Sequence, residues 1–358
     1  MFKRSEESKL TSWYFEIDRR LLGCVLLMIV LSVIFALSAG SVAAERIGQP
    51  WHFFLVKAIP FYIVGLTILF GTSFLNKKQV LLLSAANLAF GLLLLPLTVL
   101  MPNMINNSAR FVDLGPFNVM PSDIMKPGFI IITAYFLAKM KQCYGANIFF
   151  NKDAWRFNTW LSWSYYLMIF LPVVFIVFNH PDLGTSVLYL AVFSAMIFIA
   201  GMPLFLIPVL GGVGLLMLVV AFFTLGHVHR RIIAFFTGTG DTYQVDNSVD
   251  SIRHGGLLGS GDDAFVKQYL PDVHTDFIFA VIGEEHGFIG CALIICLFWT
   301  ILQRGFNIAI KCQDMYGKLL ALGLTFSICF QGFLNMWVAS SFVPATGVPM
   351  PFISYGGS

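Results

Sequence analysis

Two adjacent carboxylates interrupt an apolar stretch of the chain in a way that could support chemistry at a membrane surface. The stretch runs from Leu270 to Gly290, and its polar opening ends at Asp276. If a helix begins at Asp276, Glu284 lies about 12 Å further along its axis. A charged side chain at that depth in hydrocarbon costs roughly 2.5–3.5 kcal/mol. We therefore expect Glu284 and Glu285 to line an enclosed or water-filled cavity.

A simpler interpretation of the same stretch stays open. Thr275 or Asp276 could cap a helix, and residues 277–286 could lie at the membrane interface. Residues 287–303 alone are long enough to span a bilayer.

Other ionisable residues lie near the predicted outer ends of apolar segments. Asp123 and Lys126 are three residues apart, so they share one face of a helix, while Arg110 and Asp182 lie in polar connections. Each has a structural alternative: Asp123 and Asp182 could be helix caps, Lys126 could extend toward the surface, and Arg110 could contact lipid phosphate.

Cations beside carboxylates suit a phosphorylated, lipid-linked substrate. A carboxylate could remove a proton from a hydroxyl, and Lys or Arg could hold a diphosphate leaving group. The same residues also suit proton-coupled transport, in which acidic side chains relay protons. The residue types alone do not separate an enzyme from a transporter.

The composition identifies the elements that must position these residues. The chain is 58% hydrophobic and 11% charged, whereas soluble domains carry about 25% charged residues. We predict an all-α polytopic membrane protein with nine transmembrane helices and no nucleic-acid motif. Apolar runs of spanning length fall at about 21–40, 53–75, 79–101, 124–139, 160–179, 184–201, 203–225, 277–300 and 318–342.

Lys and Arg are concentrated in segments that lie inside if the amino terminus is cytoplasmic, which predicts that orientation. Residues 1–20 then form a cytoplasmic tail and residues 21–358 a single transmembrane domain. Residues 226–276 form a long outer loop between the seventh and eighth helices, and loops of this length are often functional. The six cysteines show no metal-ligand spacing.

Four motifs give the chain its resemblance to the SEDS family (shape, elongation, division and sporulation), which includes FtsW, RodA and SpoVE. The motifs are Arg110 with Asp113-Leu114-Gly115 and Pro121-Ser122-Asp123-x-x-Lys126; Pro181-Asp182-Leu183-Gly184-Thr185; Leu270-Pro271 with His274-Thr275-Asp276 and Glu284-Glu285; and Pro344 with the segment from Gly347 to Ser358. The family's fourth-helix motif usually has Glu where Asp123 stands.

The resemblance implies a peptidoglycan glycosyltransferase of the bacterial inner membrane that polymerises lipid II, with a class B penicillin-binding protein as its transpeptidase partner. It implies ten transmembrane helices, so we expect a further helix beyond Ser358. Carried over to this sequence, Asp276 is the expected catalytic base. Lys126, Arg110 and Asp182 match polar residues of the same cavity, and Asp123, Glu284 and Glu285 are further candidates for substrate binding.

Three points stay open at the level of sequence. A divalent cation, Mg²⁺ or Mn²⁺, could help to hold the diphosphate. The residues near the first helix resemble FtsW, which acts at the septum with other division proteins, whereas the Gly347-Val348-Pro349 ending resembles RodA; we favour the FtsW type. A lipid II flippase and a non-catalytic scaffold are the alternatives of other classes.

Overall fold

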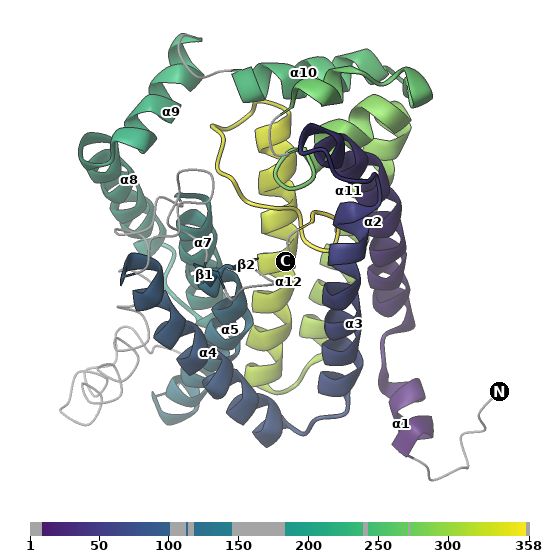
Figure 1. The fold of residues 1–358 in the computed structure, drawn as a ribbon. Coiled ribbons are helices and arrows are strands. Elements are labelled where there is room, and N and C mark those ends of the chain that lie inside the picture. The colour runs from purple at the N-terminus through teal and green to yellow at the C-terminus, as the bar shows by residue number, and fades with distance from the viewer. Residues whose placement is uncertain are drawn as a thin grey trace. The chain divides into compact units, whose positions relative to one another are not determined.

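A computed structural model describes residues 9–100, 112–113, 118–144, 183–238, 243–270 and 273–355, and this described part of the chain is mostly helical (Figure 1). The α-helices are α1 (Lys9–Glu16), α2 (Arg19–Arg46), α3 (Phe53–Ser73), α4 (Lys77–Leu100), α5 (Pro121–Tyr144), α7 (Leu183–Ala200), α8 (Leu206–Thr224), α9 (Gly226–Thr237), α10 (Tyr243–Gly255), α11 (Ile278–Lys311) and α12 (Met315–Ala339). Two short 3-10 helices, η2 (Gly261–Asp263) and η3 (Val266–Tyr269), precede α11. Strands β1 (Val112–Asp113) and β2 (Asn118–Val119) form a small antiparallel pair.

Six helices in the described part of the chain are long and apolar enough to cross a membrane, which confirms the predicted class of fold. They are α2, α3, α4, α8, α11 and α12. Shorter apolar α7 and the more polar α5 cover two further predicted ranges. The predicted range 160–179 lies outside the described residues, so the number of nine stays a prediction.

The chain divides into two compact units. The first unit comprises Met1–Val80, Asp250–Gly305 and Pro349–Ser358. The second comprises Leu81–Val249 and Phe306–Val348. The predicted site residues Asp276, Glu284 and Glu285 therefore belong to the first unit, and Asp123 and Lys126 to the second.

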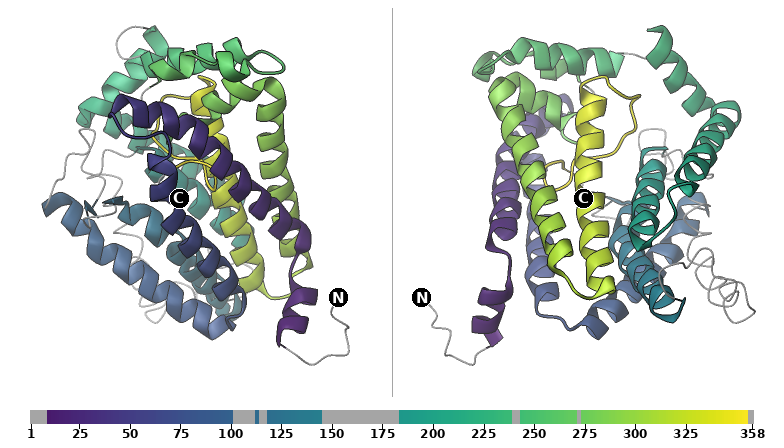
Figure 2. Two further views of the ribbon diagram at one scale, coloured as in Figure 1. Left: turned by 45° about the vertical axis from the view of Figure 1, so that its right-hand side comes forward. Right: turned by 180° about the vertical axis from the view of Figure 1, so that it is seen from behind.

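In the first unit, α2 packs along α3 (Figures 1 and 2). The Asp18 carboxylate caps α2 by accepting hydrogen bonds from the N–H groups of Arg20 and Leu21, and it also pairs with Arg304 of α11. Burial raises the pKa of Asp18, but hydrogen bonds from Arg304 and Leu21 outweigh it, so the pKa lies below its usual value. The first turn of α2 is therefore linked to the C-terminal part of α11.

In the second unit, α5, α7 and α12 pack against one another (Figure 1). Small residues permit the close approach, since a Cβ on Gly323 of α12 would lie 2.7 Å from Ile130 of α5. The hydroxyl of Tyr189 on α7 donates to the carbonyl of Ser122 at 2.6 Å and ties α7 to the start of α5. Helix α8 differs, with exposed Leu215, Leu216 and Phe223, as expected for a surface that faces lipid.

Helix α11 begins later than the sequence suggested and is bent. Its first backbone hydrogen bonds run from Ala280 and Val281 to the carbonyl of Phe277, so Asp276 lies before the helix. Gly287 has φ 64° and ψ −160°, a conformation available almost only to glycine. Residues 288–311 after this bend are long enough to span a membrane by themselves. Residues 277–286 are therefore not needed for the crossing itself, and both interpretations of this stretch stay predictions.

The predicted outer loop, residues 226–276, is more ordered than its length suggested. It contains α9, α10, η2 and η3. Positive φ angles at Gly256, Gly259 and Gly261, which glycine adopts readily, form the turns between α10 and η2. The loop therefore has a defined structure where it approaches α11.

Candidate active site

The segment that carries Asp276 is held by hydrogen bonds to its backbone. Tyr355 donates its N–H to the carbonyl of His274 at 2.9 Å, and the Ser354 hydroxyl donates to the carbonyl of Thr275 at 2.6 Å. The carboxylate of Asp276 is therefore presented from a fixed turn, and its residue is partly exposed. A partly exposed carboxylate on a fixed turn can act as a general base.

The terminal motif that holds this segment is itself a tight turn. Phe352 has φ 64°, which is uncommon for a bulky residue. The turn is maintained by a 2.8 Å hydrogen bond from the N–H of Met350 to the Ser354 hydroxyl and by a 3.1 Å bond from Ser32 of α2 to the carbonyl of Ile353. The motif that contains Asp276 and the terminal motif, which are far apart in sequence, therefore meet within the first unit.

His274 occupies an aromatic environment beside the proposed base. Its ring centroid lies 4.4 Å from that of Phe54 and 5.4 Å from that of Tyr355. Its Nδ1 atom is buried and has no hydrogen-bond partner among the described residues. Burial, together with the positive charge of Arg46, lowers the pKa of His274 to about 4. The imidazole is therefore neutral near pH 7.

The low pKa of His274 predicts acid-sensitive stability. Because the folded-state pKa lies below the usual 6.5, the unfolded state binds the proton more readily at acidic pH. This contribution to the unfolding free energy is complete above the usual pKa and falls by up to about 3 kcal/mol as the pH drops to about 4. Thermal unfolding of the wild type and His274→Phe across this range should give a smaller acid-induced loss for the variant. If the unfolding midpoints of the wild type and the variant fall in parallel as the pH drops, the low pKa assigned to His274 would be wrong.

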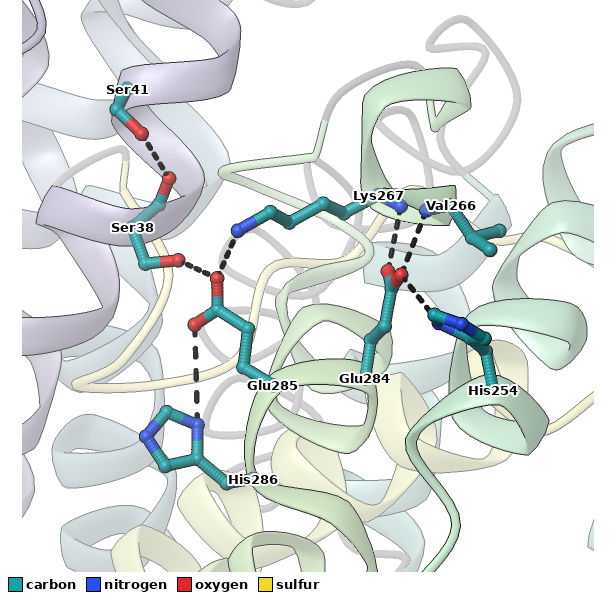
Figure 3. Close-up of polar contacts among 8 residues, drawn as sticks. All are labelled: Ser38, Ser41, His254, Val266, Lys267, Glu284, Glu285 and His286. Carbon is teal, nitrogen blue, oxygen red and sulfur yellow. Dashed lines mark hydrogen bonds and ion pairs between the residues drawn. The ribbon is translucent and has the colours of Figure 1, made fainter. Parts of the chain in front are cut away.

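Glu284 and Glu285 point to different partners (Figure 3). The carboxylate of Glu284 has no exposed surface and accepts hydrogen bonds from the N–H groups of Val266 at 2.7 Å and Lys267 at 2.6 Å. His254 Nδ1 lies 3.1 Å from the same carboxylate. Hydrogen bonds to a charged group contribute about 1.5–3 kcal/mol each. Glu284 therefore holds the start of η3 against α11.

Glu285 pairs with a cation of the same unit. Its carboxylate binds the side-chain ammonium of Lys267 and the hydroxyl of Ser38 on α2. His286 Nδ1 lies 4.0 Å from the other carboxylate oxygen (Figure 3). Glu285 thus connects α11 to α2 and to η3 in the first unit.

Lys126 is held in a polar cluster of the second unit. Its Nζ lies 2.8 Å from Oδ1 of Asp123 and donates to Oε1 of Gln331 on α12 at 2.7 Å. The Lys126 side chain is 12% exposed, so it does not extend toward the surface. Asp123 lies in the first turn of α5 and pairs with Lys126, whereas Met120 accepts the first backbone bonds of that helix. The cap interpretation of Asp123 is therefore wrong.

Sequence reasoning missed Gln331, although a signal was present. Gln331 and Asn335 are two buried amides four residues apart in an apolar helix, so they lie on one face of α12. Asn335 donates to the carbonyl of Val348 at 2.8 Å. Polar side chains on one face of a spanning helix commonly mark a functional interior.

Two of the four sequence motifs also pack together in the second unit. A Cβ on Gly184, at the start of α7, would overlap the side chains of Thr346 and Val348. Glycine at this position therefore lets the terminal motif approach the start of α7.

Asp182 and Arg110 lie outside the described residues, so their predicted roles are untested. Within the described ranges, no group of three His, Cys, Asp or Glu side chains could hold a metal ion.

Comparison with known proteins identifies relatives over nearly the whole chain. A family model described as "Cell cycle protein" (FTSW_RODA_SPOVE) matches residues 18–358. A protein of Caulobacter vibrioides named "Probable peptidoglycan glycosyltransferase FtsW" is 31% identical, and the alignment covers 100% of this chain and 89% of the relative. Stage V sporulation protein E of Bacillus subtilis is 30% identical, over 95% of this chain and 92% of that protein.

Solved structures show the same fold. A chain from a structure described as "Structural coordination of polymerization and crosslinking by a peptidoglycan synthase complex" matches with a TM-score of 0.75 and 25% identity, over 96% of this chain and 93% of that one. The rod shape determining protein RodA of Thermus thermophilus matches with a TM-score of 0.63 and 25% identity, over 96% of this chain and 92% of that one.

Proposed function

Because the chain belongs to the FtsW/RodA/SpoVE family of cell cycle proteins, we propose that it is a peptidoglycan glycosyltransferase of the FtsW type. It polymerises lipid II into glycan strands at the outer face of the inner membrane. The observation that carries this proposal is the match along almost the full chain to relatives named as FtsW glycosyltransferases. The fixed segment around Asp276 supplies a suitable base.

The reaction is an inverting glycosyl transfer. Asp276 accepts the proton of the acceptor sugar's 4-hydroxyl while that oxygen forms a bond to the donor's anomeric carbon. The bond from this carbon to the undecaprenyl diphosphate breaks, and the diphosphate leaves with the bonding electron pair. General-base assistance of this kind contributes about 10²–10⁴-fold.

The leaving diphosphate needs cations and hydrogen-bond donors. Lys126 is the described candidate, since its ammonium lies in a polar cluster with Asp123 and Gln331. Arg110 and Asp182 are proposed to complete this binding site. Glu285 of the first unit is proposed to affect substrate binding only indirectly, because Lys267 and Ser38 already bind its carboxylate.

The protein is a polytopic helical membrane protein of this family. We propose that its amino terminus is cytoplasmic, that it acts at the septum with other division proteins, and that a class B penicillin-binding protein is its partner. One structural relative comes from a complex described as coordinating polymerization and crosslinking, which supports a transpeptidase partner.

Purified protein should convert lipid II to long glycans, with and without a transpeptidase partner, in the presence of moenomycin to silence unrelated polymerases. Products can be separated by gel electrophoresis. Absence of glycans in both conditions, together with lipid II movement across liposome membranes, would instead support the flippase.

A further inference from the structure

We propose that Glu284 is a positioning residue whose buried carboxylate ties η3 to α11 and so fixes the segment that presents Asp276. The inference rests on the proposed role of Asp276 as the base. Every contact that carries it lies within the first unit.

Glu284 joins the two ends of one loop. The chain leaves η3 at Tyr269, passes through Asp276 and enters α11 at Ile278. The two N–H groups that Glu284 accepts, at 2.7 and 2.6 Å, belong to the first two residues of η3. Since both ends of the loop are pinned by one side chain, the loop has fewer conformations available to it.

Other contacts fix the same loop at separate points. Arg46 of α2 donates to the carbonyl of Leu270 at 2.7 Å and also binds the carbonyl of Gln268. Tyr355 holds the carbonyl of His274 at 2.9 Å. Glu284 links the backbone of η3 directly to α11, whereas Glu285 adds a pair with the Lys267 side chain. Removal of the Glu284 carboxylate should therefore loosen the segment between η3 and α11.

The chemistry of this position requires a carboxylate. Two backbone N–H donors face Glu284, and an ionised carboxylate offers an acceptor oxygen to each. A glutamine has one acceptor oxygen, and its NH₂ group would face the second N–H. That partly buried donor would then lose its partner, which is costly.

The backbone of Glu284 supports the same arrangement. Its carbonyl oxygen accepts a hydrogen bond from the N–H of Ser260 at 2.8 Å, just before η2. His254, at the end of α10, contacts the carboxylate and packs its ring 4.7 Å from Phe265. The last turn of α10 and the start of η3 are therefore gathered around one carboxylate (Figure 3).

Glu284→Gln tests this role in the full-length protein. We expect hydrogen exchange of the amides in residues 273–277 to become about tenfold faster, while α2 and α3 keep their protection. We expect kcat for lipid II polymerisation to fall about 10- to 100-fold because the base is misplaced, with KM within about twofold of wild type. Asp263→Asn, an exposed carboxylate of the same loop, should leave exchange and kcat unchanged.

Unchanged exchange in residues 273–277 would overturn the proposal, and so would equal acceleration across α2, α3 and α11. If Glu284→Gln cannot be purified, His254→Ala removes the third partner of Glu284 together with the ring contact to Phe265, and it should give about threefold faster exchange in the same segment. Exchange is measured without turnover. A wild type without polymerase activity would therefore count against the proposed function, and unchanged exchange would count against the role of Glu284.

Discussion

Asp276→Asn is expected to abolish glycan polymerisation while the protein stays folded. Asparagine has nearly the same shape but cannot accept the proton of the acceptor hydroxyl, so the rate should fall by about 10²–10⁴-fold. The hydrogen bonds that hold this segment use the backbone carbonyls of His274 and Thr275, which the substitution leaves in place.

The measurement is the initial rate of glycan formation from lipid II by purified wild type and variant, together with their thermal unfolding midpoints. Asp263→Asn is the matched control, since it removes one carboxylate from an exposed position in the same part of the chain. A polymerisation rate for Asp276→Asn within several-fold of wild type would refute the role of Asp276 as the base.

The positions of most helices follow from the sequence for a simple physical reason. A segment that crosses hydrocarbon must be apolar for about 20 residues, and this signal is local. The apolar runs at 21–40 and 318–342 accordingly fall within α2 and near α12. Helices α9 and α10 were missed because they are short and lie in a polar loop, where an amphipathic pattern is weaker than a long apolar run.

The partners of the site residues could not be predicted in the same way. Glu284 and Glu285 are neighbours in sequence, but successive residues of a helix point about 100° apart, and the two carboxylates bind different elements. Lys126 and Asp123 are three residues apart, so their ion pair follows from helix spacing. Gln331 lies 205 residues from Lys126 in sequence, and no local pattern identifies such a partner.

Lys126→Met is expected to remove most activity and to destabilise the protein. Loss of a cation that holds the leaving diphosphate should lower kcat/KM by about 10²–10³-fold. The substitution also leaves the Asp123 carboxylate, with 20% of its side chain exposed, without its cation. Removing one partner of a fully buried pair costs about 3–5 kcal/mol, and we expect about 2 kcal/mol here because of this partial exposure.

A second substitution separates the two effects of Lys126. In the Asp123→Asn/Lys126→Met double variant no charge is left without a partner in this pair, so the unfolding midpoint should recover most of its loss. Activity should stay low, because no cation has been restored to the diphosphate. Lys139→Met, which removes an exposed cation from the same helix, should preserve both properties. If the double variant regained activity along with stability, Lys126 would serve only to balance Asp123, and the diphosphate would have to be held by other cations.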